Sequence, residues 1–121
     1  MQPKNESKTS TVHEELAQKV CNPSKADVQQ PLDGKSIESN MQQLNGWELQ
    51  DGALAKTITF QNYYETLAFV NAVAWIAHRE DHHPDITFSY KICRVVFTTH
   101  SAKGITDNDF IAAAKVDRLF S

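Results

Sequence analysis

Apolar residues recur at helical and strand spacings from residue 36 onward, and these spacings predict the first elements of the fold. Three apolar side chains four and three residues apart predict a short helix over residues 36–44, and Asn45-Gly46 favours its end. Residues 47–50 and 54–60 are expected as two strands. Asp51-Gly52 between them suits a two-residue hairpin turn, in which both central residues need positive φ.

A charged residue interrupts the apolar face of the second strand. Leu54, Ile58 and Phe60 share one parity and would point to the same side of a sheet, and Lys56 has that parity too. Charged side chains are mostly exposed. We therefore expect this strand to lie at an edge of the sheet or to bulge at Lys56.

A long helix is expected over residues 63–82, a stretch without glycine or proline, and Pro84 would end it. Asn62 can accept a hydrogen bond from the amide of Glu65, whose side chain can reach back in a capping box. Apolar residues lie nearly all round this helix, whereas a lone surface helix shows one apolar stripe. We therefore expect one face to pack on a sheet and another against a second subunit.

Two more strands are expected over residues 86–90 and 92–99. In the last strand Cys93, Val95 and Phe97 alternate with Ile92, Arg94 and Val96, so one of the two sets faces the helices, and we consider the case in which it is the first set. His100 has the opposite parity and would then point away from that core.

A final helix is expected after the turn at Gly104, with Thr106 as its N-cap and Asp109 near the positive end of the helix dipole. The resulting order is α-β-β-α-β-β-α. Two hairpins separated by a helix predict an α+β fold in two layers, a four-stranded antiparallel sheet with helices on one face.

The first 34 residues are polar and contain little that could enter a core. Residues 1–34 are therefore expected to form a partly flexible N-terminal tail, dispensable for the fold, with a short helix over residues 14–19. Residues 35–121 would form one folded domain, since 121 residues is an ordinary length for one domain.

The composition excludes several classes of protein. Twelve Lys and Arg against 15 Asp and Glu give a net charge of −3, which argues against binding to nucleic acid or an anionic membrane. No apolar stretch approaches the roughly 18 residues of a membrane span, and the N-terminus has no apolar core of a secretory signal. Cys21 and Cys93 require no disulfide, so a cytoplasmic location is expected.

Four of the five histidines, His78, His82, His83 and His100, lie within one part of the chain. At helix and strand ends, histidines can serve structure alone by bonding free carbonyl groups. A second interpretation is a zinc site, with His78 and His82 one turn apart on a helix and His100 or Asp109 completing it. A third is acid–base catalysis without a metal, because imidazole exchanges protons near neutral pH. Composition and spacing leave the three open.

A longer series of residues brings a known family into view: His78, His82-His83-Pro84, Tyr90, Thr98-Thr99-His100 and Asp109. The series resembles the signature of the pterin-4a-carbinolamine dehydratases, also called 4a-hydroxytetrahydrobiopterin dehydratases. That signature is a polar residue, three residues, His-His-Pro, an aromatic residue, a second histidine and an aspartate. The similarity runs from about residue 15 to the end and includes Gly46-Trp47 and Phe60-Gln61-Asn62-Tyr63.

The resemblance implies an activity as well as a four-stranded antiparallel sheet with three helices on one side. The implied reaction is loss of water from 4a-hydroxytetrahydrobiopterin to give quinonoid dihydrobiopterin, a carbon–oxygen hydro-lyase reaction that recycles the pterin cofactor of aromatic amino-acid hydroxylases. An acid must protonate the departing hydroxyl, and a base must take the N5 proton; two imidazoles can do both. No cofactor or metal is expected, because the pterin nitrogen supplies the electron push.

The resemblance also assigns roles to residues. The catalytic set is His82, His83 and His100, in which His82 and His100 exchange protons and His83 binds and orients the pterin. Asp109 would hold a histidine or the pterin ring by a hydrogen bond, and Trp47 would stack near the pterin or pack in the core. The full substrate-binding set that the resemblance implies is His78, Asp81, Thr98, Thr99, Asp109 and Trp47.

One position departs from the family pattern. The first signature residue is often Glu and is His78 here, so a carboxylate that could orient His82 is missing. Glu80, two residues before His82, would face elsewhere on a helix. Activity is still expected, and its pH optimum is left open.

The expected partners are a pterin substrate, a second copy of the chain in a homodimer or homotetramer, and functionally an aromatic amino-acid hydroxylase, with no nucleic acid and no membrane. The alternative is an oligomeric binding or regulatory role without needed catalysis. Some relatives act in this way, as dimerisation cofactors of a homeodomain transcription factor. The intact histidine set favours the enzyme.

Overall fold

The computed structural model of the chain describes residues 16–22 and 30–120. Its principal elements are α3 (Gly34–Met41), β1 (Glu48–Gln50), β2 (Ala53–Thr59), α4 (Tyr63–Glu80), β3 (Asp85–Phe88), β4 (Ile92–Phe97) and α5 (Asp107–Asp117). Two short 3-10 helices, η1 (His100–Ala102) and η2 (Arg118–Phe120), flank α5. The predicted order α-β-β-α-β-β-α is confirmed.

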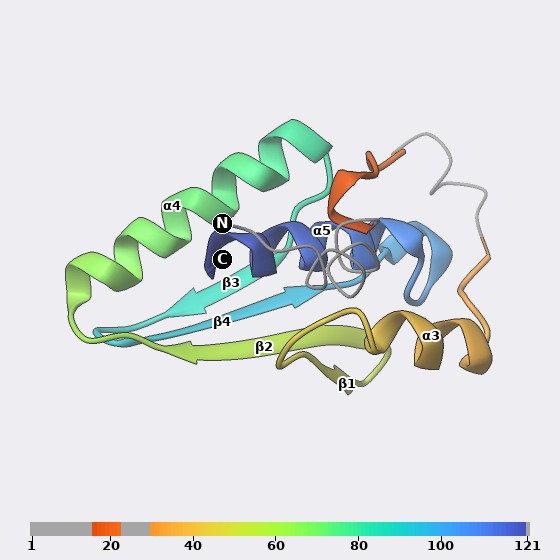
Figure 1. The fold of residues 1–121 in the computed structure, drawn as a ribbon, viewed down its shortest axis with the longest axis horizontal. Helices are drawn as coiled ribbons and strands as arrows, with labels where there is room; N and C mark the ends of the chain where they lie inside the picture. Colours follow the sequence, from red (N-terminus) through yellow and green to blue (C-terminus); the bar gives the residue numbers. More distant parts are fainter. Residues whose placement is uncertain (1–15, 23–29, 121) are drawn as a thin grey trace, which may run out of the picture.

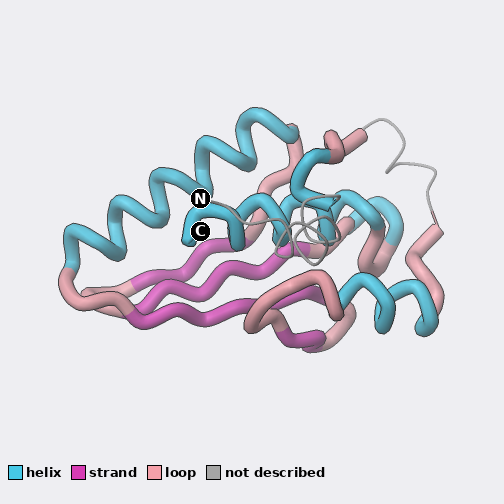
Figure 2. Tube along the Cα trace, viewed as in Figure 1, coloured by secondary structure: helices cyan, strands magenta, loops and turns pink. Residues whose placement is uncertain are grey.

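The four strands form one antiparallel sheet in the order β1-β2-β4-β3. Helices α4 and α5 lie across one face of this sheet, and α3 lies at the end of the sheet where β2 begins (Figure 1). Figure 2 shows the same two layers, with the strands below the two long helices. The predicted two-layer α+β fold with helices on one face is therefore confirmed.

The hairpin between β1 and β2 turns at Asp51 and Gly52, as predicted. Their φ angles are 51° and 74°, and Gln50 pairs with Ala53 directly across the turn. Both residues thus have the left-handed conformation that a two-residue turn of this kind requires.

The core lies between the sheet and the two long helices. Cys93, Val95 and Phe97 of β4 are fully buried there, so this is the set that faces the helices. β4 ends at Phe97, two residues earlier than expected, because Thr99 leaves the ladder and its backbone pairs with Gly104. His100 begins η1 and is exposed, so it does point away from the core.

Lys56 is neither at a bulge nor on an outer strand. β2 is an interior strand of the sheet, and its ladder with β4 runs without interruption through the pair Lys56–Val95. On the other side, pairing with β1 stops at Ala55. The prediction of an edge strand or a bulge is therefore wrong for β2 as a whole. From Lys56 onward, however, β4 is the only described strand that pairs with β2.

Lys56 is accommodated on the core face by partners distant in the sequence. Its ammonium donates to Oδ1 of Asp117 at 2.8 Å and to the carbonyl oxygen of Asn45 at 2.7 Å. The same nitrogen lies 5.9 Å from the ring centroid of Trp47 and 5.3 Å from that of Phe120. The partly buried charge is thus paired and its stem is packed, which removes the need for a bulge.

Helix bounds differ from the prediction at both α3 and α4. α3 begins at Gly34 because Asp33 caps it, accepting the Ser36 amide at 2.8 Å, and it ends at Met41 instead of residue 44. The Asn62 side chain caps α4 as expected, by accepting the Glu65 amide at 2.9 Å. The Glu65 carboxylate, however, accepts from the amide of Gln61, so the expected return bond to Asn62 is not formed.

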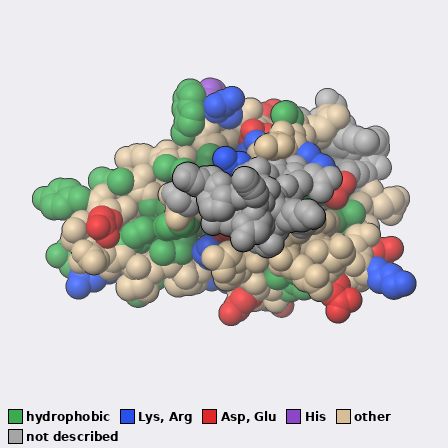
Figure 3. Space-filling model, viewed as in Figure 1, with side chains coloured by type: hydrophobic (Ala, Val, Ile, Leu, Met, Phe, Trp, Pro, Cys, Tyr) green, Lys and Arg blue, Asp and Glu red, His purple; other side chains and the backbone are tan. Residues whose placement is uncertain are grey.

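The outer side of α4 carries exposed aromatic residues. Trp75 is 59% exposed and Tyr64 is 80% exposed, while Phe69 and Val73 pack into the core. Figure 3 shows apolar side chains gathered over the left part of the molecule, including the α4 side. The second subunit that we expect against this helix stays a prediction.

Residues 16–22 pack into the domain. Leu16, Ala17 and Cys21 belong to the main hydrophobic core, and Leu16–Gln18 are helical, within the helix expected over residues 14–19. The rest of that helix, and most of the expected tail over residues 1–34, lie outside the described residues. The boundary at residue 34 stays a prediction. No described helix is long and apolar enough to cross a membrane.

Candidate active site

The structure brings together three of the residues singled out by the sequence, His82, Asp109 and Thr99. Nε2 of His82 lies 2.6 Å from Oδ1 of Asp109, and the two side chains are 11% and 0% exposed. They come from the loop after α4 and from the first turn of α5, which are 27 residues apart in the chain. A buried carboxylate therefore faces a nearly buried imidazole that solvent still reaches.

Asp109 is held by a set of donors around its other oxygen. Oδ2 accepts from the hydroxyl of Thr99 at 2.8 Å and from the backbone amide of Thr106 at 2.9 Å. The hydroxyls of Thr99 and Thr106 also lie 2.8 Å apart. Since Thr99 donates to Asp109, Thr106 donates to Thr99, and the carboxylate acts as an acceptor throughout.

This arrangement assigns the ring nitrogens of His82. Because the Asp109 carboxylate accepts, Nε2 of His82 is the nitrogen that carries a proton toward it. Nδ1 is then the nitrogen that can accept a proton from, or return one to, a bound molecule. The position of Asp109 in the first turn of α5 also suits a carboxylate, because the helix dipole is positive there.

The local backbone places His82 outside the helix. α4 ends at Glu80, because Asp81 has the left-handed conformation with φ of 53°. The amides of Asp81 and His82 both donate to the carbonyl oxygen of Ala77, which closes the last turn. The expected helix over residues 63–82 is therefore two residues too long, and His82 turns toward α5.

Phe97 supports the imidazole from the sheet. The rings of His82 and Phe97 are nearly parallel, with centroids 5.9 Å apart and 8° between their planes. Trp47 packs against the same phenylalanine at 5.8 Å, and its Nε1 donates to Asp117. Trp47 is thus a buried core residue next to the ring that supports His82, the second of the two places that we expected for it.

The remaining predicted site residues lie around the same end of the sheet. The pair Asp85–Val96 puts the start of β3 beside the end of β4, so the loop that holds His83 lies near the segment from Thr98 to His100. His83 and His100 are exposed, and the Thr98 hydroxyl donates to the carbonyl oxygen of Gly52. Asp81 is exposed at the end of α4.

His78 is separate from this group. It is exposed on α4, and its ring centroid lies 5.3 Å from that of Trp75. Because α4 ends before His82, the two histidines do not share a helix face, and the geometric premise of the zinc interpretation is wrong. Within residues 16–22 and 30–120, no three His, Cys, Asp or Glu side chains form a group that could hold a metal ion.

Two contributors to the site were not singled out from the sequence, Phe97 and Thr106. Phe97 shares parity with Cys93 and Val95, which indicates a core residue. The same parity places it on the face of the sheet that the loop after α4 passes over, which is a signal for its contact with His82. Thr106 was identified only as a helix cap. The capping bond to Asp109 was a local signal that the same carboxylate could be held for another partner.

Comparison with known proteins identifies the family. The family model for pterin 4 alpha carbinolamine dehydratase matches residues 30–119. A protein of Nitrosospira multiformis named for this family is 51% identical over 110 residues, which is 91% of this chain and 96% of that protein. Another, from Nitrosomonas eutropha, is 50% identical over 106 residues, or 87% and 93% of the two chains. The chain therefore belongs to the pterin 4 alpha carbinolamine dehydratase family.

A solved structure agrees with this assignment. The crystal structure of a transcriptional coactivator/pterin dehydratase from Brucella melitensis superimposes with a TM-score of 0.72 at 26% sequence identity. The match covers 75% of this chain and 99% of that chain.

Proposed function

We propose that this protein dehydrates 4a-hydroxytetrahydrobiopterin to quinonoid dihydrobiopterin by histidine acid–base catalysis, and so recycles the pterin cofactor of an aromatic amino-acid hydroxylase. The observation that carries the proposal is the contact between His82 and the buried Asp109 at 2.6 Å. Membership of the dehydratase family supports it independently.

The proposed chemistry uses two imidazoles, those of His82 and His100. One protonates the hydroxyl on C4a as the C4a–O bond breaks, and water leaves. The N5 lone pair forms the C4a–N5 double bond, and the second imidazole takes the N5 proton. The protons balance, since one imidazole loses one and the other gains one, and each positioned transfer is typically worth about 10²–10⁴-fold in rate.

The roles of the other residues follow from their places. Asp109 orients His82 and stabilises its imidazolium form, because the carboxylate accepts from Nε2. His83 and His100 are exposed at the same end of the sheet, so both are accessible to a bound pterin. No step in this scheme requires a metal or an organic cofactor.

An oligomer with a binding or regulatory role is the second candidate function. It is favoured by the exposed aromatic residues on the outer side of α4, Trp75 and Tyr64. The Brucella protein, whose name contains both transcriptional coactivator and pterin dehydratase, supports a regulatory role beside an enzymatic one. Light scattering of the wild type and of Trp75→Glu tests the contact: a dimer or tetramer that dissociates in the variant supports it, and a monomeric wild type contradicts it.

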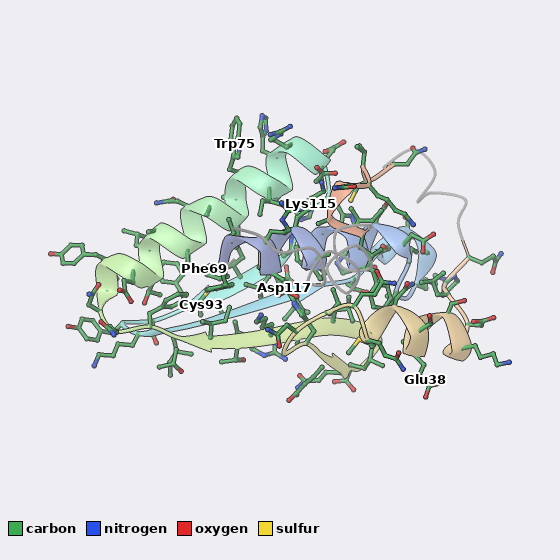
Figure 4. All side chains as sticks on the ribbon, viewed as in Figure 1. Glu38, Phe69, Trp75, Cys93, Lys115 and Asp117 are labelled. Carbon is green, nitrogen blue, oxygen red and sulfur yellow. The ribbon has the colours of Figure 1, made fainter. Side chains whose placement is uncertain are left out.

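The test of the enzyme is an assay with enzymatically generated carbinolamine, in which appearance of the quinonoid product is followed directly. We expect His82→Ala and His100→Ala each to lower kcat by about 10²-fold or more while the fold is kept. Glu38→Ala, which removes an exposed carboxylate on α3 (Figure 4), is the matched control. Circular dichroism reports the fold of each variant.

The pH dependence of the same assay is a second check. Two imidazoles acting as acid and base give a bell-shaped dependence of kcat/KM on pH. A flat profile from about pH 5 to 9, or wild-type rates in both histidine variants, would contradict the proposed mechanism.

A further inference from the structure

Residues 16–22 lie outside the part of the chain that matches the family model, yet they contact both elements that carry the candidate site. In Figure 1 this segment lies between the C-terminal end of α4 and the N-terminal end of α5. We call residues 16–22 the bridging segment. Leu16, Ala17 and Cys21 anchor it in the hydrophobic core.

On the α4 side, the bridging segment is bound through Glu80, the last residue of that helix. Oε1 of Glu80 accepts the backbone amide of Cys21 at 2.9 Å. Oε2 lies 3.5 Å from the ammonium of Lys115, which itself donates to the carbonyl oxygen of Ala17 at 2.6 Å. Figure 4 shows Lys115 on α5 beneath the end of α4. Glu80 is 8% exposed, so these contacts account for a buried carboxylate.

On the α5 side, the bridging segment is bound through Asn108. Its Oδ1 accepts the Asn22 amide at 3.0 Å, and its Nδ2 donates to the Asn22 carbonyl oxygen at 3.2 Å. The Cys21 thiol donates to the backbone carbonyl of Asn108 at 3.4 Å. Burial, followed by the charge of Glu80, raises the pKa of the Cys21 thiol to about 12, so it remains an S–H donor at neutral pH.

The two attachment points are close to His82 and Asp109 in the chain. Glu80 precedes His82 by two residues, and Asn108 immediately precedes Asp109. Both attachment residues are buried, and their contacts span 59 and 86 residues of sequence. The end of α4 and the start of α5 are therefore linked to each other by hydrogen bonds through the bridging segment.

We propose that the bridging segment is a positioning element that sets the contact between His82 and Asp109 by tying Glu80 to Asn108. Glu80 and Asn108 are positioning residues, since each acts through its neighbour and touches no reacting atom. For catalysis, this inference rests on the proposed dehydratase function. Misplacement of a reacting group by about 1 Å can cost 10²-fold in rate, so a small shift of His82 has a measurable result.

A segment that served only the stability of the core would behave differently. Loss of its contacts would then lower the midpoint of urea unfolding and leave kcat of the folded protein unchanged. A positioning role lowers kcat in protein that is still folded. It leaves KM nearly constant, because His83 and His100 remain available to bind the pterin.

The test compares Glu80→Ala with Glu80→Gln. The amide oxygen of Gln still accepts the Cys21 amide, whereas Ala removes that bond. We expect kcat to fall about 10- to 50-fold in Glu80→Ala, with KM within about threefold, and to stay within about threefold of wild type in Glu80→Gln. Asn108→Ala, which breaks the attachment to α5, is expected to match Glu80→Ala. If Glu80→Ala does not fold, kcat and KM of Asn108→Ala test the positioning role in its place. Glu38→Ala on α3 is the control.

A spectroscopic readout separates this inference from the proposed function. The hydrogen bond from Nε2 of His82 to a buried carboxylate at 2.6 Å is expected to give a low-field proton resonance, assigned by its loss in His82→Ala. We expect the resonance to shift or disappear in Glu80→Ala and Asn108→Ala and to persist in Glu80→Gln. This result supports the positioning role even if the wild type does not dehydrate the pterin, an outcome that refutes only the proposed function.

Two results would overturn the inference. One is an unchanged resonance and wild-type kcat in folded Glu80→Ala and Asn108→Ala. The other is an equal loss of kcat in Glu80→Gln and Glu80→Ala, because the effect would then come from the charge of Glu80 and not from its bond to Cys21.

Discussion

Helix α5 has a carboxylate at each end, Asp109 at the first turn and Asp117 at the last residue. Each carboxylate accepts three hydrogen bonds, but the donors differ in kind. Asp109 in the first turn accepts from His82, Thr99 and Thr106. Asp117, the last residue of the helix, accepts from the backbone amide of Asn45 and from two side chains, Trp47 Nε1 and Lys56 Nζ. The distances are similar, between 2.6 and 2.9 Å at both ends.

The helix dipole explains why the partners differ. A negative charge is favoured at the N-terminal end of a helix and disfavoured at the C-terminal end. Asp117 therefore needs a full positive charge beside it, which Lys56 supplies. Asp109 is stabilised by its position and by hydroxyl and amide donors, so its remaining partner can be an imidazole that exchanges protons. The same side chain pairs with an ammonium at one end of α5 and with an imidazole at the other.

The largest expected effect comes from Asp109→Asn. The amide can donate as well as accept, so it no longer fixes the proton on Nε2 of His82. We expect kcat for dehydration to fall by about 10²-fold or more, with the fold kept. Steady-state kinetics and circular dichroism measure the two quantities. A loss smaller than threefold would mean that Asp109 serves structure only, and the contrast between the helix ends would vanish.

Asp117→Ala tests the other end. It leaves the buried Trp47 indole and the ammonium of Lys56 without their carboxylate, and we expect it to lower the free energy of unfolding by about 2–4 kcal/mol. The kcat of the folded protein should be unchanged, because Asp109 lies roughly 12 Å away along the helix. Urea unfolding and the dehydration assay check both parts.

A matched variant refines the Asp117 test. Lys56→Met removes the charge and keeps an apolar stem between Trp47 and Phe120, so it should cost less than Asp117→Ala. If Lys56→Met is the more destabilising of the two, then leaving the Asp117 carboxylate without its ammonium at the C-terminal end of α5 costs more than removing the carboxylate itself. If kcat falls in Asp117→Ala, the two ends of α5 are coupled. That result contradicts our proposal that they are independent.

Features that depend on neighbouring residues were predictable from the sequence. Asp51-Gly52 specifies the hairpin turn because few other dipeptides accept positive φ at both positions. The parity of Cys93, Val95 and Phe97 identifies the buried face of β4, and Thr106 with Asp109 marks the start of α5. In each case the deciding interaction spans only a few residues.

Features that depend on distant partners were not predictable in this way. The charge of Lys56 is compatible with the core face only because Asp117, 61 residues later, accepts from it. The end of α4 was not predictable for a different, local reason, because Asp81 adopts a positive φ angle without being glycine. Residues 16–22 look like part of a polar tail because the partners that bury Cys21 are 59 and 87 residues away.

The smallest expected effect is a change in how the free energy of unfolding depends on pH in the alkaline range, and it concerns the Asp109 end of α5. Burial raises the pKa of Cys21, which lies against the Asp109 end, from 9.0 to about 12, and burial also raises the pKa of Cys93. The unfolded chain loses these thiol protons above pH 9, whereas the folded protein keeps them. Each thiol therefore stabilises the fold fully below pH 9, and its contribution decreases as the pH rises toward the folded pKa.

Cys21→Ser isolates the contribution of the Asp109 end. Serine does not titrate in this range and can still donate to the Asn108 carbonyl. We expect the free energy of unfolding, measured in urea between about pH 8 and 10, to fall less steeply with pH in this variant, by at most about 1.4 kcal/mol per pH unit. Equal slopes in the two proteins would show that Cys21 reaches solvent in the folded state. The contact between Cys21 and Asn108 would then be open to solvent. The positioning of Asp109 through its neighbour Asn108 would lose its support, and with it the contrast with Asp117.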